Sequence, residues 1–278
     1  MNESAPFHKY NPYVALLDKY RDVAWAGPRL PENKGRWKVF FAGRMQREPA
    51  RTILEIGSSN GAFLSALAAS HPLSAFIGLD WKYKLVFKGC EKSEKLGNKN
   101  TAFLRARAQD CETIFSPGEL DEIWLFFPDP WPKTAQQKHR LFQEPFLKSA
   151  AKLLKPGGHL HIKTDHPGYF QWMLAVMGMD FDDDAGARAI LPLGEGKSRR
   201  NRQVLHRTLE NKDLPQRSER ACADFEVAAR SYDFWPEEAT LREHFKDDPP
   251  LFWGQTTLFE ALFRKDQLPV FFLSLKRR

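Results

Sequence analysis

The chain has 278 residues, of which 28% are charged and 42% hydrophobic, a composition typical of a soluble globular protein rather than a disordered or membrane-embedded one. Its net charge of +7 points toward a polyanionic partner. No uninterrupted apolar run is long enough to span a bilayer, and the polar segment up to Tyr13 lacks the apolar core of a signal peptide. We therefore expect a cytoplasmic protein without membrane association, built as one large domain or as one domain that carries an insertion.

Three cysteines, Cys90, Cys111 and Cys222, are widely spaced and odd in number. This usage predicts buried thiols in a reducing compartment rather than a disulfide framework. No CxxC or Cys/His spacing occurs that would predict a metal site, so we expect none.

Residues 1–50 are expected to form an N-terminal arm ahead of a main domain at 51–278. The arm should contain a helix from Tyr13 to Trp25, followed by a loop rich in Gly and Pro. Basic and aromatic residues interleave at 34–37. They either contact the phosphates of a nucleic acid or pack on the main domain, and the sequence favours neither alternative.

The first repeating unit of the main domain is a strand at 52–56, a Gly-rich turn from Gly57 to Gly61 and a helix at 62–69. Free N–H groups at the start of that helix are suited to an anionic group of a nucleotide-like ligand. The turn does not match the pyrophosphate-binding pattern. Glu55, near the end of the strand, would repel a phosphate but can lie beside a positively charged group.

Further acidic residues follow the next two predicted strands, at 75–80 and 100–104. Asp80 ends the first of these strands, where a carboxylate can accept both hydroxyls of a ribose. The alternative for Asp80 is the N-cap of the helix at 84–95. Asp110 follows the second strand and can accept from an adenine amino group, but a solvated loop acid is a serious alternative.

The central feature is the string Phe126-Phe127-Pro128-Asp129-Pro130-Trp131-Pro132-Lys133, which follows an apolar strand. Its three prolines fix their own φ angles and restrict the residues before them, so Asp129 and Trp131 have little conformational freedom. Such a preorganised loop suits a site that holds a planar ring. The plain alternative is a Pro-rich turn with Trp131 packed into the core.

This string closely resembles the signature of bacterial tRNA (guanine-N7)-methyltransferases, and Lys138-His139-Arg140 is similar to the basic run that follows it in that family. Thr256-Thr257-Leu258-Phe259-Glu260 resembles the family's Thr-x-x-Glu substrate element. The sequence departs from the family pattern at Ser59, where a glycine is usual, and at residues 134–137. The resemblance covers about residues 34–180 and 254–275.

The resemblance implies methylation of guanine N7 in tRNA, at the guanine of the variable loop, with S-adenosylmethionine as the cofactor and tRNA as the partner. We expect a monomer or a homodimer, and the sequence does not decide between them. The catalytic residue would be Asp129. The implied cofactor-binding residues are Glu55, Gly57, Gly61, Asp80, Asp110 and Asp129, and the implied substrate-binding residues are Lys133, Asp165, Thr257 and Glu260.

After the Pro-rich loop, a helix is expected at 142–154 and a strand at 159–165 that ends in Asp165. His159 and His161 share one face of this strand. We interpret them as exposed strand residues because no third metal ligand is apparent. Regular alternation of strands and helices from 52 to 177 predicts an α/β fold of the Rossmann-like, class I methyltransferase type, with a mostly parallel sheet covered by helices on both faces.

The pattern changes at about 181–250, which we interpret as a polar insertion before a last strand at 270–275. Helical segments are expected at 219–230 and 237–245 within it. The basic run of Lys197, Arg199, Arg200 and Arg202 is predicted either to hold RNA phosphates or to form a solvated loop.

Two alternatives to the tRNA methyltransferase stay open at this point. The first is a non-catalytic RNA-binding protein on a methyltransferase-like fold, because a fold alone does not establish activity. The second is an amino-methyltransferase acting on adenine or cytosine, because residues 127–131 are similar to the Asp/Asn-Pro-Pro-aromatic loop of those enzymes. The Trp-Pro-Lys continuation and the Thr257–Glu260 pair favour guanine N7.

Overall fold

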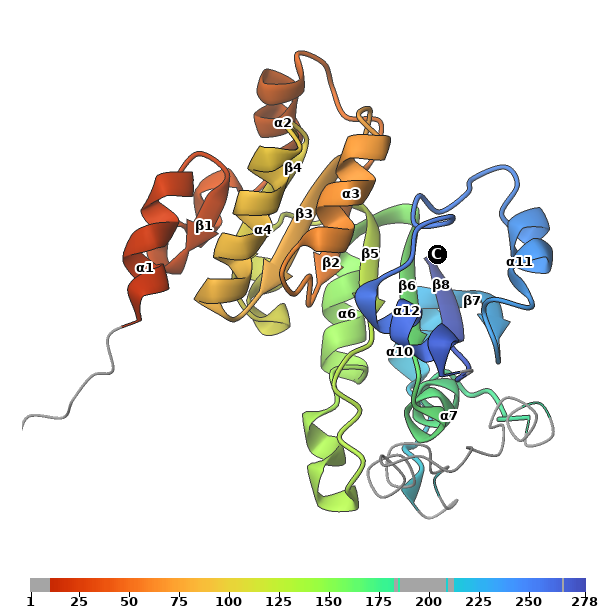
Figure 1. Ribbon diagram of the computed structural model, residues 1–278. Coiled ribbons are helices and arrows are strands. Elements are labelled where there is room, and N and C mark those ends of the chain that lie inside the picture. Colours follow the sequence, from red (N-terminus) through yellow and green to blue (C-terminus); the bar gives the residue numbers. More distant parts are fainter. Residues whose placement is uncertain (1–10, 183–184, 186–208, 210–212, 267) are drawn as a thin grey trace, which may run out of the picture.

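The computed structural model describes residues 11–182, 185, 209, 213–266 and 268–278. The described chain forms an eight-stranded sheet with the order β1-β4-β3-β2-β5-β6-β8-β7. In Figure 1 this sheet runs through the centre of the molecule, with α3 and α4 packed in front of β3 and β4. The predicted Rossmann-like α/β fold with a mostly parallel sheet is confirmed.

Six neighbouring strands, from β1 to β6 along that order, are parallel, whereas β8 runs antiparallel to both β6 and β7. The carboxyl ends of the parallel strands therefore lie along one edge of the sheet, where ligands bind in open α/β folds. The strands are β1 (Ala24–Ala26), β2 (Thr52–Ile56), β3 (Ala75–Asp80), β4 (Thr101–Arg105), β5 (Leu120–Phe126), β6 (Leu154–Thr164), β7 (Phe225–Ser231) and β8 (Phe271–Arg277).

Helices cover both faces of the sheet. The α-helices are α1 (Pro12–Leu16), α2 (Trp37–Met45), α3 (Ala62–Ser70), α4 (Tyr83–Lys95), α5 (Cys111–Ile114), α6 (Glu144–Leu153), α7 (Pro167–Val176), α10 (Glu219–Asp224), α11 (Glu238–His244) and α12 (Leu258–Lys265). Short 3₁₀ helices are η1 (Leu17–Tyr20), η2 (Gly27–Asn33), η3 (Ala108–Asp110) and η4 (Thr134–His139). No helix in the described part of the chain is long and apolar enough to cross a membrane.

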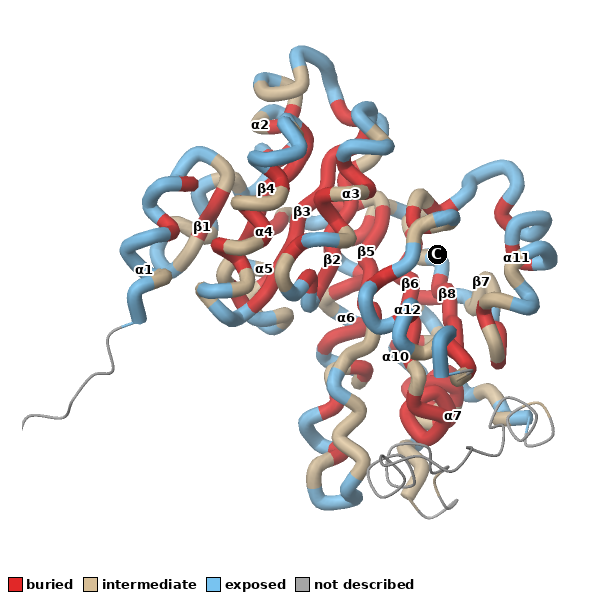
Figure 2. The backbone as a smooth tube through the Cα atoms, viewed as in Figure 1, coloured by how far each residue is buried: buried red, intermediate tan, exposed pale blue. Residues whose placement is uncertain are grey.

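The core has two layers because successive side chains of a strand point to opposite faces. Leu54 and Ile56 pack with residues of α2, α5, α6 and α7, whereas Ile53 packs with residues of α3 and α4 and with Phe252. Figure 2 shows this burial as a continuous red band along the central strands. The two layers fix the strands, and with them the positions of the loops at the sheet edge.

Two predicted helices are partly wrong, and in both places the chain adds a strand. The helix predicted from Tyr13 to Trp25 ends at Tyr20, and β1 follows as a parallel partner of β4. Its Trp25 is buried against Trp37, at a ring distance of 5.1 Å. Pairing along an open sheet edge and burial of this indole have overridden the local helical pattern.

The helix predicted at 219–230 stops at Asp224, and β7 extends from Phe225 as the antiparallel partner of β8. The segments predicted as an arm and as an insertion thus each supply one outer strand of the sheet. The basic run of Lys197, Arg199, Arg200 and Arg202 lies outside the described residues.

Candidate active site

The predicted acidic residues gather along the carboxyl edge of five adjacent strands. Glu55 lies in β2 and Asp80 ends β3. The remaining three follow the ends of β4, β5 and β6: Asp110 in η3, Asp129 in the Pro-rich loop and Asp165 directly after β6. Since the strand order there is β4-β3-β2-β5-β6, these residues form one row along the sheet edge.

The Gly-rich turn between β2 and α3 contains three residues in the left-handed region, with φ of +82° at Gly57, +51° at Ser59 and +65° at Gly61. The N–H groups of Gly57 and Ser58 both donate to the Leu79 carbonyl, which ties the turn to β3. A Cβ at Gly61 would lie 2.5 Å from the Cα of Gly89 in α4. Gly61 is therefore required for close packing of the turn on α4.

Glu55 is a buried carboxylic acid whose Oε2 has no hydrogen-bond partner among the described residues. Burial, together with the smaller effects of the negative charges of Glu260 and Asp80, raises its pKa to about 8. A buried acid of this kind has an unmet need for a donor or a cation. It fits the predicted role beside the positively charged part of S-adenosylmethionine.

The next two predicted cofactor residues each keep one carboxylate oxygen occupied by the backbone. Oδ1 of Asp80 accepts from the N–H of Lys82 at 2.9 Å, and burial raises the Asp80 pKa. Oδ2 of Asp110 accepts from the N–H of Arg107 at 2.8 Å. These bonds fix both side chains at the sheet edge, and the backbone N–H of Ser59 also supports the Asp80 carboxylate.

The Pro-rich loop holds two aromatic residues in left-handed conformations, with φ of +52° at Phe127 and +43° at Trp131. Such strained positions are found at functional sites where the surroundings enforce them. The Phe127 N–H donates to the Lys163 carbonyl at 2.8 Å. Between the two strained residues, Asp129 is exposed, as is Lys133 at the end of the loop.

The Thr-x-x-Glu element forms the N-terminus of α12 as a reciprocal capping box. Thr257 Oγ1 accepts from the Glu260 N–H at 3.1 Å, and Glu260 Oε2 accepts from the Thr257 N–H at 2.8 Å. Glu260 Oε1 accepts from Lys163 Nζ at 2.6 Å, and both of these side chains are fully buried. Substrate contacts by Thr257 and Glu260 stay a prediction, and the structure adds that Glu260 anchors α12 to β6.

Ring contacts bring the Pro-rich loop and α12 together. Phe127 lies 5.9 Å from Phe259 and 5.4 Å from Phe263 between ring centroids. Asp165, half-buried at the end of β6, has a pKa raised by burial. The predicted substrate residues therefore come from three segments, 127–133, 165 and 257–260, that start from neighbouring strands or pack on them.

The sequence did not predict the burial of two charged residues near the site, Lys163 and Arg140. Lys163 reads as one polar residue of an alternating strand, yet it is fully buried with its ammonium group 3.9 Å from the Phe234 ring centroid. Arg140 reads as part of a basic run, yet it is buried. The sequence offered one indication for Lys163. It alternates with His159 and His161 along the strand, which places all three side chains on one face.

The two histidines are not exposed, contrary to the prediction. His159 and His161 are buried and stack at 5.3 Å, and His161 packs on Phe252 and Phe272. Burial lowers the pKa of both, most strongly for His161. The segment around Phe252 covers this face of the sheet, which the strand pattern alone could not indicate.

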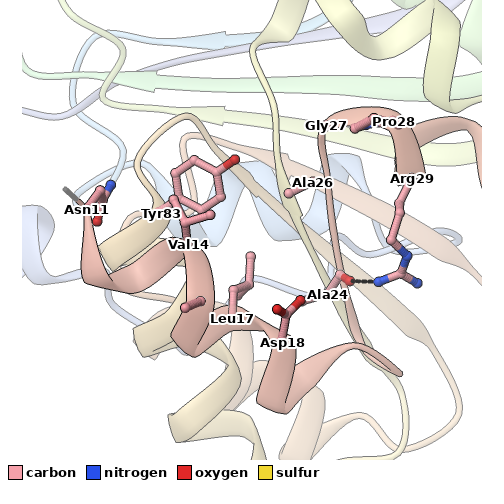
Figure 3. A pocket seen from close by; sticks show the side chains of 11 residues that line it. Asn11, Val14, Leu17, Asp18, Ala24, Ala26, Gly27, Pro28, Arg29 and Tyr83 are labelled. Carbon is pink, nitrogen blue, oxygen red and sulfur yellow. Dashed lines mark hydrogen bonds between the residues drawn. The ribbon is translucent and has the colours of Figure 1, made fainter. Parts of the chain in front are cut away.

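A separate cavity of about 550 Å³ lies between α1, η1 and the start of η2. Figure 3 shows Val14, Leu17 and Tyr83 around it, with Arg29 bonded to the Ala24 carbonyl. None of the predicted site residues lines it, so we place the candidate active site at the row of acids instead.

Comparisons with known proteins show the family to which the chain belongs. Residues 49–184 match a family model described as "Putative methyltransferase". A tRNA (guanine-N7)-methyltransferase of Bdellovibrio bacteriovorus is 33% identical over 164 residues, which cover 58% of this chain and 76% of that protein. One of Lactococcus lactis subsp. cremoris is 30% identical over 222 residues, covering 72% of this chain and 100% of that protein.

A bifunctional glycosyltransferase/methyltransferase of Fusobacterium nucleatum is 34% identical over 169 residues, covering 60% of this chain and 25% of that protein. The range that matches the family model, 49–184, includes both the Gly-rich turn and the Pro-rich loop. The chain belongs to the family of the tRNA (guanine-N7)-methyltransferases.

Proposed function

We propose that this protein transfers the methyl group of S-adenosylmethionine to N7 of a guanine in tRNA, and that its target is the guanine of the variable loop. The observation that carries the proposal is the convergence of the strained Asp129 loop and the capped N-terminus of α12 beside buried Glu55, whose Oε2 has no hydrogen-bond partner among the described residues. Family membership supports the same reaction.

The cofactor is S-adenosylmethionine, which supplies an electrophilic methyl group on a sulfonium. Glu55 would lie near its positive charge, Asp80 would accept from its ribose hydroxyls and Asp110 from its adenine. The turn at 57–61 would offer backbone N–H groups to its carboxylate. Gly57 fits this role because the turn needs φ of +82° there.

Guanine N7 carries a free lone pair and no proton, so the reaction needs no general base. The protein must hold the base in line with the methyl group, exclude water and bind the guanine edge. Asp129 and Asp165 can accept from the guanine N1–H and amino group, and Thr257 and Lys133 complete the contacts. Carboxylates also stabilise the positive charge that develops on the methylated purine.

Nucleoside analysis of tRNA incubated with the protein and labelled cofactor tests the proposal. We expect label in 7-methylguanosine, and label in methylated adenosine or cytidine would favour the amino-methyltransferase alternative. Loss of the variable-loop guanine by substitution in the tRNA should abolish the signal. Cofactor binding without any methylated product would identify a non-catalytic RNA-binding protein.

Asp129→Asn adds a test of the assigned residue. The amide keeps the shape but replaces one acceptor with a donor that opposes the guanine N–H groups, so we expect a loss of roughly 10²–10³ in turnover. The matched control is Glu243→Gln on α11, an exposed acid far from the loop. A cytoplasmic location and a monomer or homodimer remain predictions.

A further inference from the structure

The basic run after the Pro-rich loop contains three residues with two different environments. Lys138 and His139 are exposed, whereas Arg140 has a relative exposure of 2%. An arginine that is removed from solvent to this degree is not available to RNA phosphates. Its guanidinium group therefore interacts with groups inside the protein, and its hydrogen bonds identify them.

The Arg140 guanidinium bonds the backbone of the Pro-rich loop. Its Nε donates to the Pro130 carbonyl at 2.8 Å, and its Nη2 lies 3.5 Å from the Trp131 carbonyl. These two carbonyls directly follow Asp129. A rigid, forked donor that bonds consecutive carbonyls restricts the peptide planes between them, which a lysine cannot do in the same way.

Two aromatic rings of α7 hold the guanidinium in place. Its central carbon lies 5.0 Å from the Tyr169 ring and 4.8 Å from the Trp172 ring. Both rings are fixed on Phe142, whose N–H donates to the Tyr169 hydroxyl at 3.0 Å and whose carbonyl accepts from Trp172 Nε1 at 3.1 Å. The support for the loop therefore continues into the core of the molecule.

The loop needs such support because Phe127 and Trp131 both have positive φ angles. Bulky residues leave that region unless their surroundings enforce it. Burial lowers the Arg140 pKa to about 10, so the side chain stays charged at neutral pH and bonds the carbonyls as a cation. Trp131 also packs on His139 at 5.3 Å between ring centroids.

We infer that Arg140 is a positioning residue for methyl transfer, which fixes the loop that carries Asp129 and does not contact tRNA. The inference rests on the proposed function of Asp129. It separates Arg140 from its neighbour Lys138, although both belong to one basic run in the sequence.

Turnover and tRNA binding are measured for Arg140→Met, Arg140→Lys and Lys138→Met. The control is Lys246→Met, at an exposed lysine that follows α11. Arg140→Met should lower kcat at least tenfold, while tRNA affinity and its dependence on salt stay as in the wild type. Arg140→Lys, which keeps the charge but loses the fork, should also lower kcat. Lys138→Met should instead weaken tRNA binding and reduce the salt slope by up to about 1.

Hydrogen exchange reports on the loop independently of activity, so it also applies if the wild type proves inactive. Hydrogen exchange of the Phe127 and Gln136 amides, which donate to the carbonyls of Lys163 and Lys133, should accelerate in Arg140→Met and Arg140→Lys relative to Lys138→Met, while the amides of β5 stay protected. Guanidinium ion added to Arg140→Ala should restore kcat in part. A reduced salt slope with normal kcat and normal loop exchange in Arg140→Met would overturn the inference, and absence of methylation by the wild type would refute the proposed function alone.

Discussion

Two buried glutamates at the same edge of the sheet, Glu55 in β2 and Glu260 in α12, have opposite surroundings. Glu260 bonds the Lys163 ammonium through one oxygen and the Thr257 N–H through the other. Glu55 leaves Oε2 without a partner among the described residues. Burial alone therefore does not assign a role, because the partners decide whether a carboxyl group supports the fold or is left for a ligand.

The two sites are also electrostatically connected. The negative charge of Glu260 raises the pKa of Glu55, after the larger effect of burial. Lys163 compensates that charge, since its Nζ lies 2.6 Å from Glu260. A change at the substrate side of the site should thus be felt at the cofactor side.

The largest effect on stability is expected when the ion pair between Lys163 and Glu260 is removed. Lys163→Met leaves the Glu260 carboxylate buried without its cation, which should cost roughly 3–5 kcal/mol of unfolding free energy in urea titrations. The double variant Lys163→Met with Glu260→Gln should recover a large part of that loss. Stability within 1 kcal/mol of the wild type in Lys163→Met would mean that the pair contributes little.

Glu55→Gln tests the glutamate that lacks a cation partner. It should affect cofactor binding and not lower stability. The amide replaces a buried acid whose Oε2 has no donor in the described part of the chain, so stability should be unchanged or higher. Cofactor affinity should fall by on the order of 1.5–3 kcal/mol because a bond to a charged group is lost. Calorimetry with S-adenosylmethionine measures this, with Glu243→Gln as the control. Normal affinity in Glu55→Gln would remove Glu55 from the cofactor site.

The pH dependence of stability and of cofactor binding tests Glu55 further. The folded-state pKa of Glu55 is about 8, above its ordinary value of 4.5, so folding favours the protonated form. Its contribution to stability is fully present below pH 4.5 and is lost as pH rises toward 8. A cationic cofactor requires the ionised form, so affinity should increase with pH up to about 8, by at most about tenfold per unit.

Calorimetry in buffers of different ionisation enthalpy should detect release of up to one proton on cofactor binding at pH 7, and none in Glu55→Gln. S-adenosylhomocysteine, which lacks the sulfonium charge, should release fewer protons. Equal proton release by wild type and Glu55→Gln would assign the proton to another group.

The row of acids could be predicted from the sequence because it depends on local rules. A parallel strand brings its last residue and the loop after it to one edge of the sheet, so the places of Asp80 and Asp129 at that edge could be predicted from the strand pattern. The strand pattern also predicted the parallel sheet. The strand pattern could not predict which segments far apart in the sequence pair with one another.

Lys163 and Arg140 illustrate what the sequence leaves open. Their roles depend on partners far along the chain, Glu260 for the first and Tyr169 and Trp172 for the second. The outer strands β1 and β7 were missed for the same reason, because each is stabilised by a neighbouring strand and not by its own pattern.

The smallest effect is expected in the turn that follows the strand of Glu55. Ser59 has φ of +51° where the family usually has glycine, and its backbone N–H supports the Asp80 carboxylate. Glycine relieves a left-handed strain of about 1–2 kcal/mol but adds unfolded-state entropy worth about 0.4–1 kcal/mol. Ser59→Gly should therefore stabilise the protein by no more than about 1.6 kcal/mol in urea titrations, and cofactor affinity should be kept because the N–H remains. Gly57→Ala is the matched opposite, since it introduces a Cβ at φ of +82° and should destabilise the turn and weaken cofactor binding. Destabilisation by Ser59→Gly would show that the serine side chain has a role in the turn beyond its backbone.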